Sequence, residues 1–220
     1  MGGGRGEGIR YEIVNSMLSY LDTDTLLCWA PPHDPSTSNI SLSNSNSSSR
    51  DADPDELDKQ GATLRETQIR TAKPILAYLT QQLWPGVELK PTLDDGTIMP
   101  RSQPPATRAV VKGWMAGLPA WELVGLERAV LAGKSLCVGA RLVYEWSEAF
   151  GPQRMGEKGE RFGIEKAADA CSLEVRWQTG RWGEVEDSHD VDKEDLRRQL
   201  GSVVLLVSGT GEGRGSGDNV

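Results

Sequence analysis

The stretch PAWELVGLERAVLAGKSLCVGARLVYEW (119–146) decides the fold, because its apolar residues surround two consecutive helices rather than lining one face. A helix that is apolar on every side is buried inside a protein. We therefore predict two core helices here, with Gly133 and Gly139 allowing neighbouring backbones to approach closely. The apolar residues of the first helix are Trp121, Leu123, Val124, Leu126, Val130 and Leu131, and those of the second are Leu136, Val138, Leu142, Val143 and Trp146.

The tripeptide Gly133-Lys134-Ser135 in this stretch is also how a phosphate-binding loop ends. Such a loop needs a second glycine five positions before the Gly-Lys pair, where this chain has Arg128. It also follows a buried strand, whereas residues 120–130 have the composition of a helix. We predict that Gly133 lets two helices meet, and a nucleotide-binding enzyme built on this segment stays as the less favoured alternative.

Amphipathic helices are predicted on both sides of this centre, so the fold class is mainly α. In YEIVNSMLSYL (11–21) the apolar residues recur at helical spacing. The last predicted helix ends in SVVLLV (202–207), which alone would also pass as a strand. Further helices are predicted over 63–83, 106–118 and 163–178, and from Asp190 or Asp192 to 207. Pro74 is expected to kink the helix over 63–83 or to start a new one. Between the helices, 84–105 is predicted to be a long loop with room for a short strand, and 148–161 a connector.

Segments of low complexity divide the chain. Residues 33–62 are rich in Ser, Asn and Asp, and 208–220 form a polar, glycine-rich tail, so neither has much to bury and both are expected to be disordered. Residues 1–10 are expected to be a disordered remnant. The predicted organisation is therefore a helical domain made of 11–32 and 63–207, interrupted by the insert at 33–62.

Charge and composition exclude several classes of protein. With 24 Lys and Arg against 32 Asp and Glu the formal net charge is −8, and no basic stripe stands out, so nucleic acid is not an expected partner. The longest apolar run, 129–146, is interrupted by Lys134, Arg141 and Glu145, so no membrane span is expected. Three cysteines without Cys-x-x-Cys spacing indicate neither a disulfide framework nor a zinc site.

The acidic stretch EVEDSHD (184–190) is the best candidate for a cation site or a catalytic base, since four carboxylates surround His189. It has no calcium-loop spacing and no second histidine nearby, so we interpret it as a solvated helix start. The chain has no nucleophile elbow, dinucleotide-binding glycine motif or His-Glu-x-x-His motif, and neither a metal nor a cofactor is expected. The chain has seven tryptophans, and tryptophan among helices serves the core or a protein contact; those singled out here are Trp121, Trp146, Trp177 and Trp182.

Several stretches together resemble one family, the mitochondrial assembly chaperones that bind the α subunit of the ATP synthase catalytic head. Four of them follow in the family's order: YLDTDTLLCWA (20–30), LPAWELVGLERAVLAGKSLCVGARL (118–142), SLEVRWQTGRWGEVEDSHD (172–190) and KEDLRRQLGSVVLLV (193–207). PILAYLTQQLWPGVELKPT (74–92) and the loop with Gly96, Ile98, Met99 and Pro100 fit the same pattern. The resemblance covers nearly all of the chain that is expected to be ordered.

The resemblance implies the multihelical C-terminal domain of such a chaperone and a non-enzymatic role in the mitochondrial matrix. The partner would be the unassembled α subunit, held as an unfolded-protein client until it pairs with β, and the chaperone would be a monomer. The acidic residue that the family requires falls on Glu174. The other residues expected at the partner surface are Leu173, Trp177, Trp182, Asp22 and Asp24.

The family also carries a β-rich domain before the first helix and a matrix presequence, whereas about ten residues precede the first predicted helix here. We therefore expect the chain to be a fragment, a product of a mispredicted start, or a truncated form. The alternative function is a truncated helical scaffold without chaperone activity.

Overall fold

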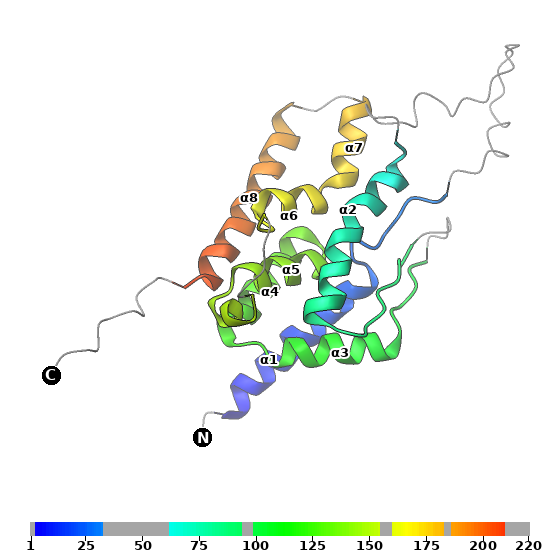
Figure 1. The fold of residues 1–220 in the computed structure, drawn as a ribbon. Helices are drawn as coiled ribbons and strands as arrows, with labels where there is room; N and C mark the ends of the chain where they lie inside the picture. The colour runs from blue at the N-terminus through cyan, green and yellow to red at the C-terminus, as the bar shows by residue number, and fades with distance from the viewer. Residues whose placement is uncertain (1–2, 33–61, 94–98, 155–159, 183–185, 210–220) are drawn as a thin grey trace, which may run out of the picture.

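The computed structural model describes residues 3–32, 62–93, 99–154, 160–182 and 186–209, with the backbone alone for 3–5, 181–182 and 186–190. These residues form helices joined by turns and extended segments, so the predicted mainly α fold class is confirmed (Figure 1). The α-helices are α1 (Gly3–Ser19), α2 (Leu64–Tyr78), α3 (Pro105–Ala116), α4 (Ala120–Gly133), α5 (Leu136–Trp146), α6 (Ile164–Cys171), α7 (Leu173–Trp182) and α8 (Glu186–Val207). Shorter helical turns are η1 (Tyr20–Asp22), the π-helical η4 (Leu79–Leu83) and η5 (Glu148–Arg154).

Helix α5 forms the centre of the core, as predicted. Its residues from Leu136 to Glu145 are all buried, and it packs against α2, α4, α6 and α8. Even its charges are enclosed, because Arg141 forms an ion pair with Glu145 one turn later and lies 3.5 Å over the ring of Tyr78. A buried charge needs such partners, since without them its desolvation is not offset.

Helix α4 was predicted to be buried on all sides, and this is wrong for one face. Its buried face packs against α5 and α8, but Trp121 is 66% exposed, and Val124 and Leu131 are also exposed. The apolar pattern does not reveal this, because the neighbours of α4 cover only part of its circumference. Trp121 is therefore not a core residue of the described structure.

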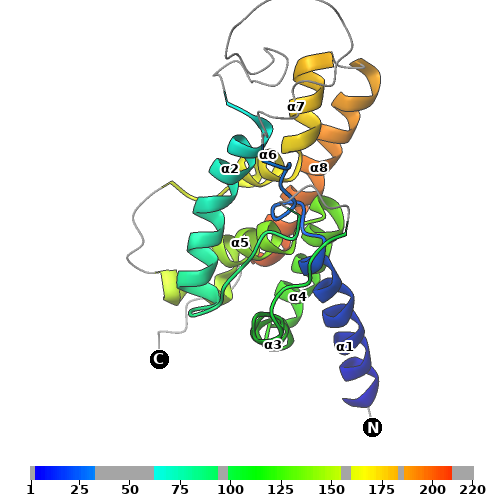
Figure 2. The ribbon, with the colours of Figure 1, turned by 90° about the vertical axis from the view of Figure 1, so that its right-hand side faces the viewer.

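Helix α1 begins at Gly3, so residues 3–10, expected to be disordered, are helical instead. Two contacts with the end of α3 hold this extension in place: Arg10 Nη1 donates to the carbonyl oxygens of Ala116, at 3.3 Å, and Leu118, at 2.7 Å. Those carbonyls lie at or just after the C-terminus of α3, where a helix leaves acceptors unpaired. Figure 2, turned by 90° from Figure 1, shows α1 and α3 at the same end of the molecule.

One predicted helix, 163–178, is two helices. Helix α6 ends at Cys171, and α7 begins at Leu173 and leaves in a different direction (Figures 1 and 2). Ser172 lies at the break, with its hydroxyl donating to the carbonyl oxygen of Ala168 at 2.7 Å. A serine hydroxyl that bonds the carbonyl four residues earlier competes with the helix ladder and favours a bend.

The predicted long loop 84–105 contains no strand in its described part, and only an isolated parallel bridge joins Leu93 to Cys28. Side-chain amides take the place of a second strand. Gln103 accepts from the Lys90 N–H at 3.0 Å and donates to the Lys90 carbonyl at 2.6 Å. Gln68 donates to the Cys28 carbonyl and accepts from the Ala30 N–H. The backbone of these extended segments is thereby paired without a sheet.

Helix α2 starts at a complete capping box, in which Thr63 accepts from the Glu66 N–H while the Glu66 carboxylate accepts from the Thr63 N–H. Pro74 lies within this helix and does not start a new one. Residues 202–207 belong to α8, so the helical interpretation of SVVLLV is confirmed. The insert predicted at 33–62, except Ala62, and the tail from 210 lie outside the described residues.

No helix among the described residues is long and apolar enough to cross a membrane.

Two helical glycines should respond oppositely to substitution by alanine. A Cβ at Gly113, in the middle of α3, meets nothing within 4 Å, so Gly113→Ala is expected to stabilise the protein by about 0.5–1 kcal/mol. A Cβ at Gly133 would lie 2.5 Å from the Sγ of Cys171, so Gly133→Ala is expected to destabilise it by about 1–3 kcal/mol. Urea unfolding followed by circular dichroism measures both. Equal shifts for the two variants would contradict the close approach of Cys171 to Gly133.

Candidate partner-binding site

Glu174 lies in the first turn of α7 and is exposed. Its carboxylate accepts a long hydrogen bond, 3.4 Å, from the side-chain amide of Gln178. No lysine or arginine among the residues with described side chains forms an ion pair with it. The start of a helix carries partial positive charge, so it is a favourable position for an acidic side chain. Glu174 therefore presents a negative charge that is available to a partner.

Glu174 lines a hollow of about 240 Å³ that lies between α2, the start of α7 and the segment after η1. Leu173 lines it as well and is half-buried, whereas Trp177 is half-buried and does not line it. Trp182 ends α7, and its side chain lies outside the described atoms. Of the predicted partner residues, the structure thus brings together Glu174 and Leu173.

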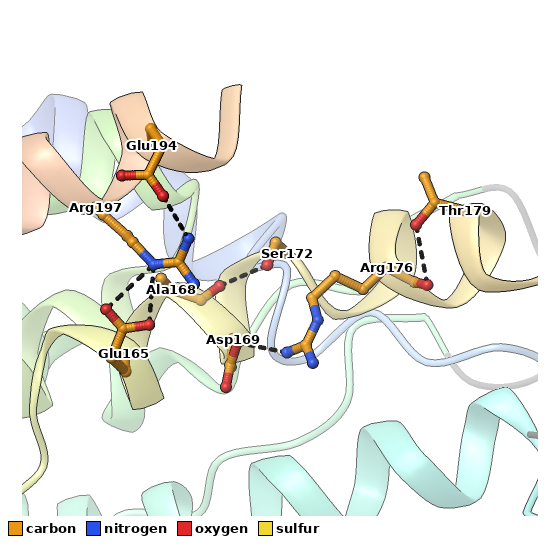
Figure 3. A network of polar contacts seen from close by, with 8 residues as sticks. All are labelled: Glu165, Ala168, Asp169, Ser172, Arg176, Thr179, Glu194 and Arg197. Atoms are coloured by element: carbon orange, nitrogen blue, oxygen red, sulfur yellow. Dashed lines mark hydrogen bonds and ion pairs between the residues drawn. The ribbon is translucent and has the colours of Figure 1, made fainter. Parts of the chain in front are cut away.

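Polar contacts set the position of α7 against α6, and of α6 against α8 (Figure 3). Arg176 of α7 pairs with Asp169 of α6 at 2.5 Å. Arg197 of α8 pairs with Glu165 of α6 at 2.9 Å and with Glu194 of its own helix. Each exposed pair contributes little free energy by itself, about 0–1 kcal/mol. Together with the break at Ser172 they orient the helix that carries Glu174.

Asp24, predicted to contact a partner, is completely buried, so that prediction is wrong. Its carboxylate accepts three hydrogen bonds: from the Ser135 hydroxyl at 2.5 Å, from the Cys137 N–H at 2.9 Å and from the Leu26 N–H at 3.0 Å. Burial raises the pKa of Asp24 above its ordinary value, although these hydrogen bonds act in the opposite direction. The residue joins the N-terminal segment to the start of α5.

Asp22, also predicted to contact a partner, directs its carboxylate inward. It accepts from the Gln103 N–H at 3.0 Å and forms an ion pair with Arg108 of α3. Both of its oxygen atoms are therefore used within the fold, and the structure gives Asp22 a packing role.

The segment that resembles a phosphate-binding loop joins α4 to α5, as predicted. Lys134 ends α4 in the left-handed backbone conformation, with φ of 54°, and Ser135 caps α5 by accepting from the Val138 N–H. In a phosphate-binding loop an anion would lie at this helix start. Here the carboxylate of Asp24 accepts from the first turn of α5 and fills that position.

The three cysteines are free thiols, and two of them, Cys28 and Cys171, line the same hollow as Glu174. Burial raises the pKa of all three thiols above the ordinary value: that of the half-buried Cys28, that of Cys171 to about 12, and that of Cys137 well above the ordinary value. A thiol with a raised pKa stays protonated at neutral pH and is a poor nucleophile and metal ligand. In the described structure, Cys28 and Cys171 therefore serve as lining of the hollow and Cys137 as a buried packing residue.

The side chains of the acidic stretch 184–190 lie outside the described atoms. Among the residues whose side chains are described, no group of three His, Cys, Asp or Glu is placed to hold a metal ion.

The residues of α2 that line this hollow were not predicted from the sequence. Gln68 and Thr71 line it, one helical turn apart on the same face of α2, and Gln68 is buried. The signal was available, because polar residues repeat at i and i+3 on a face that otherwise points inward.

Gln68 both lines the hollow and pairs with the backbone of Cys28 and Ala30, which leads to a prediction. Gln68→Glu removes the N–H that bonds the Cys28 carbonyl and places a charge where the side chain is buried, so it is expected to cost about 1–3 kcal/mol at pH 7. Gln178→Glu, which changes an exposed glutamine of the same hollow, should cost less than about 0.5 kcal/mol. Denaturant unfolding measures both. A Gln68→Glu variant as stable as the unmodified chain would mean that the amide pairing contributes nothing.

Two fungal proteins match almost the whole chain, although no protein-family model matches it. It is 27% identical to the mitochondrial protein atp12 of Schizosaccharomyces pombe over 194 residues, which are 88% of this chain and 52% of that protein. It is 28% identical to the mitochondrial ATP12 protein of Saccharomyces cerevisiae over 201 residues, which are 89% of this chain and 53% of that protein. The chain spans about half the length of these curated relatives.

Solved structures share the fold. Atp12 from Paracoccus denitrificans has a TM-score of 0.60 and 13% identity, with 94% of this chain and 67% of that chain covered. A protein of Agrobacterium tumefaciens that has been suggested to be a chaperone has a TM-score of 0.54 and 17% identity, with 90% of this chain and 56% of that chain covered. By sequence the chain is homologous to the mitochondrial Atp12 proteins of two yeasts over nearly nine-tenths of its length, and it has the fold of a bacterial Atp12.

Proposed function

We propose that the chain is an assembly chaperone for the mitochondrial ATP synthase, which binds the unassembled α subunit of the catalytic head and prevents its aggregation before it pairs with β. The observation that carries this proposal is the homology to Atp12 over nearly nine-tenths of the chain, together with the family motifs in the sequence. An orphan subunit exposes a large apolar interface, which a partner can cover until assembly.

The proposed contact surface is the start of α7. Glu174 supplies an exposed carboxylate there, Leu173 an apolar wall, and Trp177 and Trp182 follow on the same helix. The role is proposed to be non-enzymatic, and the place the mitochondrial matrix, since both fungal relatives are mitochondrial proteins. We further propose that the chain acts as a monomer and that 11–32 and 63–207 form one helical domain.

A pull-down tests this function directly. Purified residues 1–220 are mixed with α and β subunits that were expressed separately, and capture of α without β is expected. A second assay follows light scattering while unfolded α subunit is diluted, with suppression expected near a one-to-one ratio. Capture of neither subunit by a folded sample would favour the helical scaffold without chaperone activity.

A further inference from the structure

Three hollows follow one side of α2 and share their walls. The first, with Glu174 on its edge, measures about 240 Å³, and a second of about 260 Å³ adjoins it through Gln68 and Glu174. A third, of about 400 Å³, adjoins the first through Thr71. Figures 1 and 2 place α6 and α7 beside α2 along this side. The shared residues make the three hollows one groove, which we call the α2 groove.

The end of the α2 groove near Tyr78 is apolar and its charges are neutralised. Pro74, Tyr78 and Phe162 form its walls. Its charged residues are already paired within the protein: Lys166 with Glu160 at 2.9 Å, Asp169 with Arg176, and Arg141 with Glu145. An apolar side chain of a partner fits this end, because burying it there leaves no protein charge unpaired.

The opposite end has a different character, because Glu174 there lacks an ion partner among the residues with described side chains. It also lies on a protein with a net charge of −8. A carboxylate that is covered on binding must be matched by a cation or by hydrogen-bond donors, since otherwise its desolvation weakens the complex. This end therefore fits a lysine or arginine side chain.

We infer that the α2 groove binds one extended segment of the client, with a basic side chain against Glu174 and an apolar side chain between Pro74, Tyr78 and Phe162. The inference rests on the proposed function and specifies the kind of client segment that is held. From Leu64 to Tyr78 the helix rises about 21 Å at 1.5 Å per residue. An extended segment covers that length with about six or seven residues.

The first test uses overlapping 15-residue peptides that cover the α subunit, with binding measured by fluorescence anisotropy against the full chain. Peptides that carry a basic residue about six positions from an apolar one are expected to bind. Thr71→Trp fills the junction of the groove and should weaken binding of these peptides, and of the α subunit, at least tenfold. Lys73→Trp places the same side chain at an exposed position of α2 that lines none of the three hollows, and should leave both unchanged.

The second test exchanges charges. The Glu174→Lys variant should no longer bind the peptides that the unmodified chain binds. A peptide with glutamate in place of its basic residue should bind this variant. If the chain captures the α subunit but Thr71→Trp captures it equally well, the groove proposal is wrong while the function stands. If the chain captures no α subunit, the function itself fails. A dimer of this chain that Thr71→Trp dissociates in sedimentation would overturn the inference in favour of self-association.

Discussion

Glu174→Lys is expected to abolish capture of the α subunit while the helical circular dichroism stays unchanged. The side chain is exposed in the first turn of α7, and its one described hydrogen bond is the long one from Gln178. Charge reversal removes an attraction to the client and adds a repulsion, so the affinity should fall about a hundredfold or more. Pull-down followed by titration of labelled α subunit measures the loss.

Two variants separate a contact from a general charge effect. Glu12→Lys makes the same change on an exposed residue of α1 and should bind normally. Glu174→Gln keeps the shape and removes only the charge, so an intermediate affinity is expected. Loss of helical signal in Glu174→Lys would mean that the residue is structural and would contradict the contact role.

Asp24→Ala is expected to cause the largest loss of stability, about 3–5 kcal/mol, which is a large part of a typical domain's total. The change leaves the hydroxyl of Ser135 and the N–H groups of Leu26 and Cys137 buried without an acceptor. Asp24→Asn retains one oxygen and should cost about 1–3 kcal/mol, so it stays measurable if the alanine variant does not fold. Asp169→Ala, at an exposed ion pair, should cost less than about 1 kcal/mol. Urea unfolding is the measurement, and comparable losses for Asp24→Ala and Asp169→Ala would contradict the role of the buried carboxylate.

The raised pKa of Asp24 adds a pH dependence whose sign can be worked out. Between the ordinary value of 3.8 and the higher folded value, the folded protein keeps a proton that the unfolded chain has released. Ionisation of Asp24 therefore lowers the free energy of unfolding as the pH rises through this interval, and below it the contribution is complete. The stability advantage of the unmodified chain over Asp24→Asn should accordingly shrink from pH 3 to pH 7. An advantage that grows with pH would mean that the three hydrogen bonds outweigh burial.

Periodicity predicted most helices, because each of them buries a stripe of apolar residues. It could not predict the break at Ser172, which depends on one side-chain hydrogen bond, or the exposed face of α4, which depends on how many neighbours surround that helix. The start of α1 was missed because contacts of Arg10 with the end of α3 are tertiary. The errors about α4 and α1 concern contacts between elements that are distant in the sequence, whereas the hydrogen bond at Ser172 is local.

The candidate site was only partly predictable. Family resemblance indicated Glu174, and the structure places it on the edge of a groove. Asp24 was misassigned because acidic residues in a polar turn are usually solvated, and only the fold brings the start of α5 next to it. A partner contact of Asp22 stays a prediction, and the fold adds an ion pair with Arg108 that the sequence does not indicate. The groove itself combines α2 with α6 and α7, so no single stretch of sequence encodes it.

The hydrogen bonds of Asp24 also have a consequence for biosynthesis. They join residues 111 and 113 positions apart, so the core of the N-terminal segment stays open until α5 has been made. At about 5–20 residues per second, this takes roughly 6–23 s of translation. During that interval α1 can pack against α3, which is made before α5, but the core that includes Val14 and Met17 of α1 and Leu21 of η1 is still incomplete. A protein proposed to guard an orphan subunit thus passes through its own unprotected state while it is being synthesised.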